Sequence, residues 1–383
     1  MHNGISMKKN ILFVVHNLKV GGIQKITLET AKYYAKQGYE TNILLLDNTI
    51  ELNVDFDCNI HTLNLNKSLI YKPWLAIYYA FYKVILRNII PKSEFIWASA
   101  IYKKLFNQFL ATQSQFDAIF VNGARSMHRL STVKHERIVY SLHLPYTLTK
   151  KNNFYYNFLL KKLFTNKKLF TVSDYIRMPL QKKITQLNIR VKALETIYNP
   201  CDIDKTILLA EEPIDFDEQY VLGVGRFSKQ KRFDRLIDAY FKANIPEKLV
   251  LIGDGSLKNE LKKQVESLGI SDKVVFKGFD LNPYRWMKKA KLFILSSDNE
   301  GFVLVVNEAL VCGTPVVATD CGPIGEILTG SLKDGIAKKN SDDLALKIQS
   351  YMENPIYPEA KHIEKLSFDV IVKQQLKLAG SDH

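Results

Sequence analysis

Residues 220–256 read YVLGVGRFSKQKRFDRLIDAYFKANIPEKLVLIGDGS and indicate an α/β fold. Residues 220–224 and 248–252 are apolar runs with the length of a buried strand, and residues 232–243 between them carry apolar side chains at helical spacing. A strand, a helix and a second strand in this order are typical of a parallel sheet with helices on its faces.

Strands and helices alternate through most of the 383 residues. Further strands are predicted at 11–15, 42–46, 118–121, 138–141, 170–172, 192–197, 273–276, 292–295 and 315–318, and further helices at 23–36, 256–268, 283–289 and 303–311. We therefore predict an α/β protein with two Rossmann-like domains, joined near residues 199–213, whose parallel sheets face each other across a cleft. The predicted domains are residues 1–200 and 201–365, followed by a helix in 366–383 that packs back on the first domain.

The composition is that of a globular protein, with 46% hydrophobic and 24% charged residues. These values exclude a disordered chain, a collagen and a coiled coil, and no window reaches the roughly 18 uncharged apolar residues of a membrane span. The first apolar run is too short for a signal peptide. The four cysteines form neither C-x-x-C nor a metal-finger spacing, so we expect free thiols in a reducing cytosol.

Positive charge is concentrated in the first half of the chain. The net charge is +14, but residues 1–200 contain 28 Lys and Arg against 11 Asp and Glu, whereas residues 201–383 contain 25 against 28. This division suggests two domains with different partners, and the basic half suits nucleic acid, an anionic membrane surface or an anionic substrate. General solubility of a lysine-rich chain is the alternative explanation.

The segment YKPWLAIYYAFYKVILRNII, residues 71–90, combines aromatic and basic side chains. Trp and Tyr favour the headgroup layer of a membrane, and Lys and Arg favour anionic lipid, so a helix here would anchor the protein at an interface. An amphipathic helix that covers the domain core is an equally good interpretation. In the first interpretation, the basic pairs Lys161-Lys162 and Lys167-Lys168 extend the same surface.

Parallel sheets bind ligands in the loops that leave the carboxyl ends of their strands, and the first such loop contains Gly21 and Gly22. These glycines open the helix predicted at 23–36. Glycine lets the backbone approach a ligand closely, and free N–H groups at a helix start attract anions. The pattern is not G-x-G-x-x-G, and a simple tight turn explains the pair equally well.

The loop after the strand at 220–224 supplies two cations, Arg226 and Lys231, beside a helix start. Such an arrangement suits a diphosphate, because Coulomb attraction and hydrogen bonds act together. Lys229 and Arg232 lie in the same loop, so a solvated basic turn is the alternative.

Residues 296–320, SSDNEGFVLVVNEALVCGTPVVATD, contain two glutamates with seven residues between them. Glu300 lies at a helix start and Glu308 about two turns further along, at roughly 3.6 residues per turn. Carboxylates accept hydrogen bonds from neighbouring sugar hydroxyls, so the two suit a ribose and a hexose, while the N–H groups of residues 301–303 would face a phosphate. A glutamate that favours the helix dipole, with an unrelated surface glutamate, is the alternative.

His143 follows the strand at 138–141 in the basic half, where it is expected at the cleft. A histidine there is suited to donating a hydrogen bond to a sugar or to acid–base chemistry. A purely structural histidine is the alternative.

Taken together, these loops resemble the retaining GT-B glycosyltransferases of family 4, which transfer sugars from nucleotide-sugar donors. The resemblance covers nearly the whole chain and is densest at residues 223–326. The order and spacing of several short motifs carry it: Gly21-Gly22, His143, Ser173, Gly225-Arg226 with Lys231, Gly253-Asp254-Gly255, Phe276-Lys277-Gly278, and Glu300 with Glu308.

The resemblance implies a role for each candidate residue in binding a UDP- or GDP-linked sugar. Cations would stabilise the departing diphosphate, carboxylates and the histidine would contact sugars, and glycines or main-chain amides would approach phosphates. The residues are Arg226 and Lys231 for the diphosphate; Glu308 for the ribose; Glu300 and His143 for the transferred sugar; Gly21, Gly22, Gly301, Phe302 and Val303 for main-chain contacts; and Lys277 beside the base.

The resemblance further implies an enzyme that moves a hexose or N-acetylhexosamine to a saccharide or lipid-linked acceptor held by the basic domain. We expect a cytoplasmic protein, peripheral on the inner face of the membrane, that serves lipopolysaccharide, capsule or polyprenyl-linked glycan synthesis and binds no nucleic acid. No D-x-D sequence follows a strand at the cleft, so no metal and no other cofactor is expected. Retention by front-face attack is the expected mechanism, with closure of the domains to exclude water.

The chain departs from the family pattern at three places. Asn199-Pro200 stands where Asn-Gly is usual, Val305 stands where a proline is frequent, and the last glycine loop reads CGPIGE. A nucleotide-sugar 2-epimerase of the same fold and a non-enzymatic basic nucleic-acid-binding protein are the alternative functions. An oxidoreductase would need a dinucleotide fingerprint, which the sequence lacks.

Overall fold

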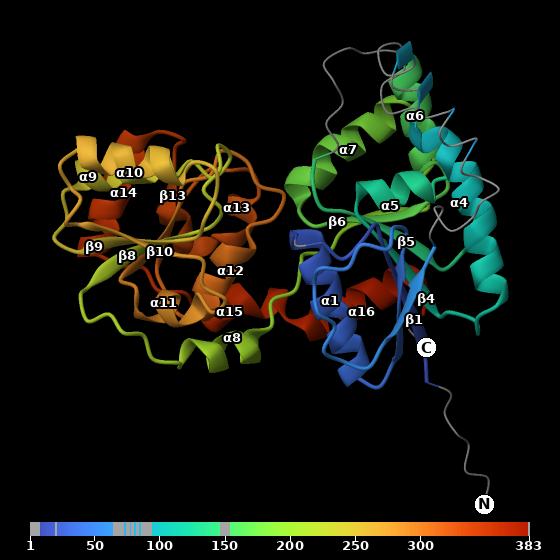
Figure 1. The fold of residues 1–383 in the computed structure, drawn as a ribbon, viewed down its shortest axis with the longest axis horizontal. Helices are drawn as coiled ribbons and strands as arrows, with labels where there is room; N and C mark the ends of the chain where they lie inside the picture. The colour runs from blue at the N-terminus through green and yellow to red at the C-terminus, as the bar shows by residue number, and fades with distance from the viewer. Residues whose placement is uncertain are drawn as a thin grey trace, which may run out of the picture. The chain divides into compact units, whose positions relative to one another are not determined.

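The computed structural model describes residues 8–19, 21–63, 94–145 and 154–381, together with a few isolated positions between 73 and 85. Within these residues the chain divides into two compact units (Figure 1). The first unit contains residues up to Val172, Ile176–Ile197 and the residues from Val372 onward, and the second contains Ser173–Tyr175 and Tyr198–Ile371.

The first unit is built on a seven-stranded parallel sheet in the order β3-β2-β1-β4-β5-β6-β7. Its strands are β1 Asn10–Val15, β2 Glu40–Leu45, β3 Asn59–Thr62, β4 Ala118–Asn122, β5 Ile138–Leu142, β6 Lys168–Thr171 and β7 Ala193–Thr196. The helices of this part of the chain are α1 Gly22–Lys36, α4 Glu94–Ala111, α5 Ala124–Arg129, α6 Phe154–Phe164 and α7 Asp174–Gln186. β1, β4 and β5 are buried along their whole length, as expected for central strands covered on both faces.

The second unit is built on a six-stranded parallel sheet in the order β10-β9-β8-β11-β12-β13. Its strands are β8 Tyr220–Val224, β9 Lys248–Ile252, β10 Val274–Gly278, β11 Leu292–Leu295, β12 Val316–Thr319 and β13 Ile336–Ala337. Its helices are α8 Ile203–Ala210, α9 Phe233–Ala243, α10 Lys258–Ser267, α11 Tyr284–Lys289, α12 Leu304–Val311, α13 Ile324–Ile327, α14 Ser341–Glu353 and α15 Ala360–Ile363. α16, Phe368–Ala379, ends in the first unit, where Lys9 Nζ donates a hydrogen bond to Ser381 O at 2.8 Å.

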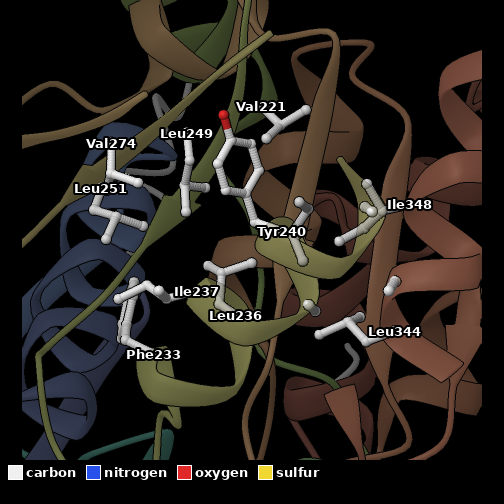
Figure 2. Packing of buried hydrophobic residues seen from close by; sticks show 14 of the residues in the cluster. Val221, Phe233, Leu236, Ile237, Tyr240, Leu249, Leu251, Val274, Leu344 and Ile348 are labelled. Atoms are coloured by element: carbon white, nitrogen blue, oxygen red, sulfur yellow. The ribbon is translucent and has the colours of Figure 1, made fainter. Parts of the chain in front are cut away.

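The core of the second unit forms where α9 packs on the sheet. Phe233, Leu236, Ile237 and Tyr240 recur at helical spacing and meet apolar side chains of β8 and β9, beside α14 (Figure 2). Burial of each such side chain contributes about 1.5–3 kcal/mol. The buried Tyr240 hydroxyl donates a hydrogen bond to Glu247 O at 2.7 Å, so no polar cost offsets this packing.

The predicted fold class is confirmed: both halves of the chain are Rossmann-like parallel sheets. Every predicted strand forms, with its ends displaced by at most two residues. The sequence analysis missed β3 and β13, because β3 is largely exposed at the sheet edge and β13 has two residues. It also missed several helices, among them α8 inside the predicted linker and α14, which covers the core of the second unit.

The aromatic and basic segment at 71–90 lies outside the described residues, apart from isolated positions, so the membrane anchor stays a prediction. Among the described helices, none combines the length and hydropathy that crossing a bilayer requires. The four cysteines are free thiols.

Candidate active site

The strand order in the sheet of the second unit reverses between β8 and β11. β9 and β10 extend it beyond β8, whereas β12 and β13 extend it beyond β11. Open parallel sheets bind ligands at this position, because the loops after the two central strands turn to opposite faces. Arg226 and Lys231 lie in the loop after β8, and Glu300 lies in the loop after β11.

Closely packed glycines fix the loop after β8. Gly225 N–H donates to Ile252 O at 2.9 Å, and Gly253 N–H donates to Gly278 O at 2.7 Å, which ties the turns after β8, β9 and β10 together. Gly253 has a φ of +146°, and a Cβ there would lie 1.9 Å from Gly225 O. A Cβ at Gly255 would lie 2.4 Å from Phe227 O. Only glycine fits these positions, and the contact holds the backbone just before Arg226.

Lys231 and Glu300 form an ion pair between the two loops. Lys231 Nζ lies 2.7 Å from Glu300 Oε1, and the side chains are 23% and 10% exposed. Gln230 Nε2 donates to Asn299 O at 2.7 Å and holds the same loops together. A pair so shielded from water is screened less than a surface pair, so its charges interact strongly with an incoming anion or hydroxyl.

Asp298, in the loop after β11, anchors the basic loop after β8. Its carboxylate accepts a hydrogen bond from Arg235 Nη2 at 2.5 Å and from Arg232 Nη1 at 3.3 Å. Burial works against ionisation of Asp298, but the hydrogen bonds and charges of the two arginines outweigh it and lower the pKa of this carboxyl. Arg232 has a φ of +52°, an unfavourable conformation that these ion pairs hold in place.

The basic residues of this loop and of the start of α9 therefore fall into two groups, those that form ion pairs and those that are exposed. Arg232 and Arg235 hold the backbone, whereas the guanidinium of Arg226 and the ammonium of Lys229 are exposed and have no ion-pair partner among the described residues. The alternative of a solvated basic turn therefore does not describe Arg232, whose guanidinium is ion-paired.

The backbone after Glu300 presents unused hydrogen-bond donors. Within the described part of the chain, no acceptor contacts the N–H groups of Gly301, Phe302 and Val303, which precede the first residue of α12. Ser173 Oγ donates to Gly301 O at 3.0 Å, and the Phe302 ring stacks on Tyr198 with centroids 5.7 Å apart. Both contacts fix this turn in a conformation that suits an anion.

Glu308 lies on α12, where its Oε1 accepts a hydrogen bond from Tyr284 Oη at 3.2 Å. Burial and the charge of Glu308 raise the pKa of Cys312, one turn further on, to about 12. In the described part of the chain, no hydrogen bond or ion pair is found between Glu308 and either Lys231 or Glu300. Its neighbour Asn307 is fully buried, and neither of its side-chain polar atoms has a partner in that part of the chain.

Lys277 extends from β10 over two aromatic rings. Its Nζ lies 5.0 Å from the ring centroid of Phe216 and 4.9 Å from that of Trp286. The ammonium is therefore held by cation–π contacts, and a role beside a base remains a prediction.

The packing of the first unit does not require glycine at positions 21 and 22, where Gly21 and Gly22 stand. Gly21 has an extended backbone with a φ of −178°, and Gly22 begins α1. A Cβ on Gly22 would meet no atom within 4 Å, and one on Gly21 would meet the flexible end of Gln24 alone. The tight-turn alternative is therefore not supported by strain or crowding at these positions.

A chain of hydrogen bonds orients His143, directly after β5. Thr27 Oγ1 donates to Ile23 O at 2.7 Å and accepts from Asn122 Nδ2 at 2.9 Å. Asn122 Oδ1 then accepts the Ser141 hydroxyl at 2.8 Å, which leaves the Ser141 oxygen as acceptor for His143 Nε2 at 2.9 Å. These directions assign the proton of neutral His143 to Nε2 and leave Nδ1 as an acceptor.

Burial lowers the pKa of His143 to about 4, so the ring is neutral at pH 7. The sequence alone suggested a hydrogen-bond donor or an acid–base group. The hydrogen-bond directions favour a different role, in which Nδ1 accepts a hydrogen bond from a hydroxyl group.

Nitrogen-15 NMR of the histidine ring tests this assignment. We expect the Nε2–H tautomer at pH 7 in the wild type, and a mixture of tautomers in Thr27→Val, because Asn122 then loses the acceptor that fixes its amide. Thr30→Val, buried on the same helix, is the control and should leave the ring signals unchanged. A wild-type ring protonated at Nδ1 contradicts the assignment.

The sequence analysis missed Asp298, Tyr284 and the residues that orient His143. An acidic residue at a strand end, three residues after β11, was the available signal for Asp298. In the described part of the chain, no group of three His, Cys, Asp or Glu side chains has the arrangement of a metal site. Independence from metal stays a prediction.

Residues 204–366 match the family described as glycosyl transferases group 1. An N-acetylgalactosamine-N,N'-diacetylbacillosaminyl-diphospho-undecaprenol 4-alpha-N-acetylgalactosaminyltransferase of Campylobacter jejuni is 28% identical, over 82% of this chain and 81% of that protein. The lipopolysaccharide 1,6-galactosyltransferase of Escherichia coli is 27% identical, over 39% of this chain and 44% of that protein.

Solved structures share the fold over nearly the whole length of the chain. A glycosyltransferase from Rickettsia africae has a TM-score of 0.69 at 16% identity, over 97% of this chain and 98% of that one. Anabaena HepE, solved with UDP and glucose, has a TM-score of 0.61 at 20% identity, over 98% of this chain and 97% of that one. At these identities the likeness establishes the fold.

Proposed function

We propose that this chain, which has the GT-B fold, is a group 1 glycosyltransferase that transfers a hexose or N-acetylhexosamine from a UDP- or GDP-linked donor to a saccharide or lipid-linked saccharide. The name of the Campylobacter jejuni relative supports a lipid-linked acceptor, and that of the Escherichia coli relative supports lipopolysaccharide synthesis. We place the reaction in the synthesis of a bacterial surface glycan.

One observation carries the proposal: the Lys231–Glu300 pair joins the loops after β8 and β11. The same loops carry the exposed Arg226 and the N–H groups of residues 301–303, which have no acceptor in the described part of the chain. A nucleoside diphosphate needs cations and N–H donors, and its sugar needs an acceptor for hydroxyl hydrogen bonds. Arg226 and Lys231 supply the first and Glu300 the second. Glu308 serves the ribose, and Lys277 borders the base.

We propose a retaining reaction without metal. The acceptor hydroxyl attacks the anomeric carbon on the face from which the diphosphate leaves, the carbon–oxygen bond to the diphosphate breaks, and the departing phosphate oxygen takes the hydroxyl proton. Fixed cations stabilise the charge that develops on this oxygen. Neutral His143 accepts a hydrogen bond from the transferred sugar.

The first unit holds the acceptor in this proposal, and Gly21 and Gly22 leave space for the donor phosphates. Its excess of Lys and Arg favours an anionic membrane surface, so we place the protein in the cytoplasm, peripheral on the inner face of the membrane. Nucleic acid is not a partner in this proposal.

Thermal unfolding with a panel of UDP- and GDP-sugars tests donor binding. A donor at 100 times its Kd stabilises the folded protein by about 2.7 kcal/mol. We expect one nucleotide class to raise the Tm of the wild type. Arg226→Ala should lose that rise because it removes a cation proposed to bind the diphosphate, and in the described part of the chain its guanidinium has no ion-pair partner whose loss would disturb the fold. Lys229→Ala removes an equally exposed cation of the same loop and should keep the rise.

Analysis of the products then distinguishes sugar transfer from 2-epimerisation of the nucleotide sugar. A donor that is consumed only when a saccharide acceptor is present, with retained anomeric configuration, supports the proposal. Formation of an epimer of the donor without any acceptor contradicts it.

A further inference from the structure

A second basic site lies in the first unit, at the edge of the sheet opposite to His143. A pocket of about 1130 Å³ is lined by the segment before β5, the last turn of α6 and the starts of β6 and β7. Parallel strands of four or five residues separate this amino edge from the carboxyl edge by about 15 Å. The pocket is therefore distinct from the site proposed above.

Lysine dominates the charge of this pocket, which we call the lysine pocket. Glu136 is the one carboxylate among the described residues that line it. The six lysines are Lys134, Lys161, Lys162, Lys167, Lys168 and Lys192. In the described part of the chain, no carboxylate lies within ion-pair distance of them, whereas Lys242, Lys248 and Lys258 of the second unit are all paired.

Lys167 is the unusual member, because its side chain is buried and all its partners are neutral. Its Nζ donates to Ser131 O at 2.8 Å and to Tyr140 Oη at 3.3 Å, and it lies 4.6 Å from the centroid of the Tyr140 ring. The Tyr140 hydroxyl donates in turn to Leu130 O at 3.1 Å. A buried cation without a counter-ion is costly, and an anion that enters the pocket removes that cost.

The other lysines place further cations around this buried charge. Lys168 Nζ is held by Ala379 O at 2.8 Å, and Lys162 Nζ lies 5.9 Å from the Phe158 ring. Lys134, Lys161 and Lys192 are exposed, and in the described part of the chain their ammonium groups make no hydrogen bond or ion pair with a side chain. A compact, multiply charged oxyanion satisfies several ammonium groups at once, which singly charged carboxylates do not.

We propose that the lysine pocket binds a phosphate-bearing ligand, with Lys167 as the buried contact and Lys161 and Lys162 as the outer contacts. The ligand is either a small soluble phosphate or the headgroup of an anionic lipid, since both present the same group. The proposal stands on the first unit alone and does not depend on the donor site.

Calorimetric titration with pyrophosphate tests the soluble source. The Arg226→Ala variant serves as background, because it removes the proposed donor site in the other unit. In that background we expect saturable binding, weakened about tenfold or more by Lys167→Met through loss of a charged hydrogen bond. Lys161→Gln with Lys162→Gln, exposed on α6, gives a second test if Lys167→Met fails to fold, and Lys36→Gln, at the same sheet edge outside the pocket, should bind unchanged.

Co-sedimentation with phosphatidylcholine vesicles, with and without phosphatidic acid, tests the lipid source. The proposal is supported if the affinity for pyrophosphate or for the phosphatidic acid vesicles falls in the pocket variants and is unchanged in Lys36→Gln. Which of the two ligands binds then identifies the source of the phosphate. If neither ligand binds, or if the pocket variants and Lys36→Gln bind alike, the proposal is wrong. Pyrophosphate binding that is insensitive to Arg226→Ala but lost in the pocket variants supports the lysine pocket and gives no support to the donor site, so the two proposals fail separately.

Discussion

Lys231→Met will lower the rate of sugar transfer by about 10²–10³-fold, the usual effect of removing one fixed group that stabilises transition-state charge. The Lys231 ammonium lies 2.7 Å from Glu300 Oε1, so the ion pair fixes its position. Glu300→Gln should cause a comparable loss, because the amide keeps the shape of the side chain but accepts hydroxyl hydrogen bonds less strongly. Initial rates at saturating donor measure both effects.

The same pair also contributes to stability, and the two roles are separable. Lys231→Met leaves a nearly buried carboxylate without its partner and should lower the free energy of unfolding by about 1–3 kcal/mol. The double variant Lys231→Met with Glu300→Gln removes both charges, so it should regain most of that stability and none of the activity. Lys229→Met is the matched control and should resemble the wild type in both measurements. Wild-type turnover in Lys231→Met would refute the assigned role.

Gly253→Ala will lower the free energy of unfolding by about 3–5 kcal/mol, which combines backbone strain with a steric clash. The added Cβ would lie 1.9 Å from Gly225 O, a backbone atom that cannot move without displacing Arg226. Any protein that still folds should therefore have lost donor-induced stabilisation. Chemical denaturation and thermal shift with donor measure the two effects.

Gly269→Ala provides the control for this substitution. Gly269 also has a positive φ, +67°, but a Cβ there would meet no atom within 4 Å. Its cost should be that of the backbone conformation alone, about 1–2 kcal/mol, with donor binding intact. If Gly253→Ala and Gly269→Ala lowered the free energy of unfolding equally, the close contact between Gly253 and Gly225 O would not be the reason for the expected cost at Gly253.

The architecture was predictable because the central strands are buried on both faces and read as continuous apolar runs. Residues 220–224 and 248–252 became β8 and β9 with the predicted bounds. β3 was not predictable in this way, since Asn59–Thr62 is an edge strand with mixed polarity. α8 lies where a linker was expected, and its sequence, IDKTILLA, is a short helix capped by Asp202.

The sequence singled out candidate residues but not how they pair. Lys231 and Glu300 are 69 residues apart, and they meet because β8 and β11 are neighbours, which strand order along the chain does not reveal. Arg235 and Asp298 meet for the same reason and were missed. The tautomer of His143 depends on Thr27 and Asn122, from two other elements, so the sequence suggested a donor where the structure favours an acceptor.

A crystal structure with an intact nucleotide sugar, collected under conditions that prevent turnover, tests the central claim most directly. We expect diphosphate oxygens within hydrogen-bond distance of Lys231 Nζ and the Arg226 guanidinium, with a sugar hydroxyl on Glu300. A donor bound elsewhere on the second unit, with the Lys231–Glu300 pair undisturbed and remote from the phosphates, would contradict it.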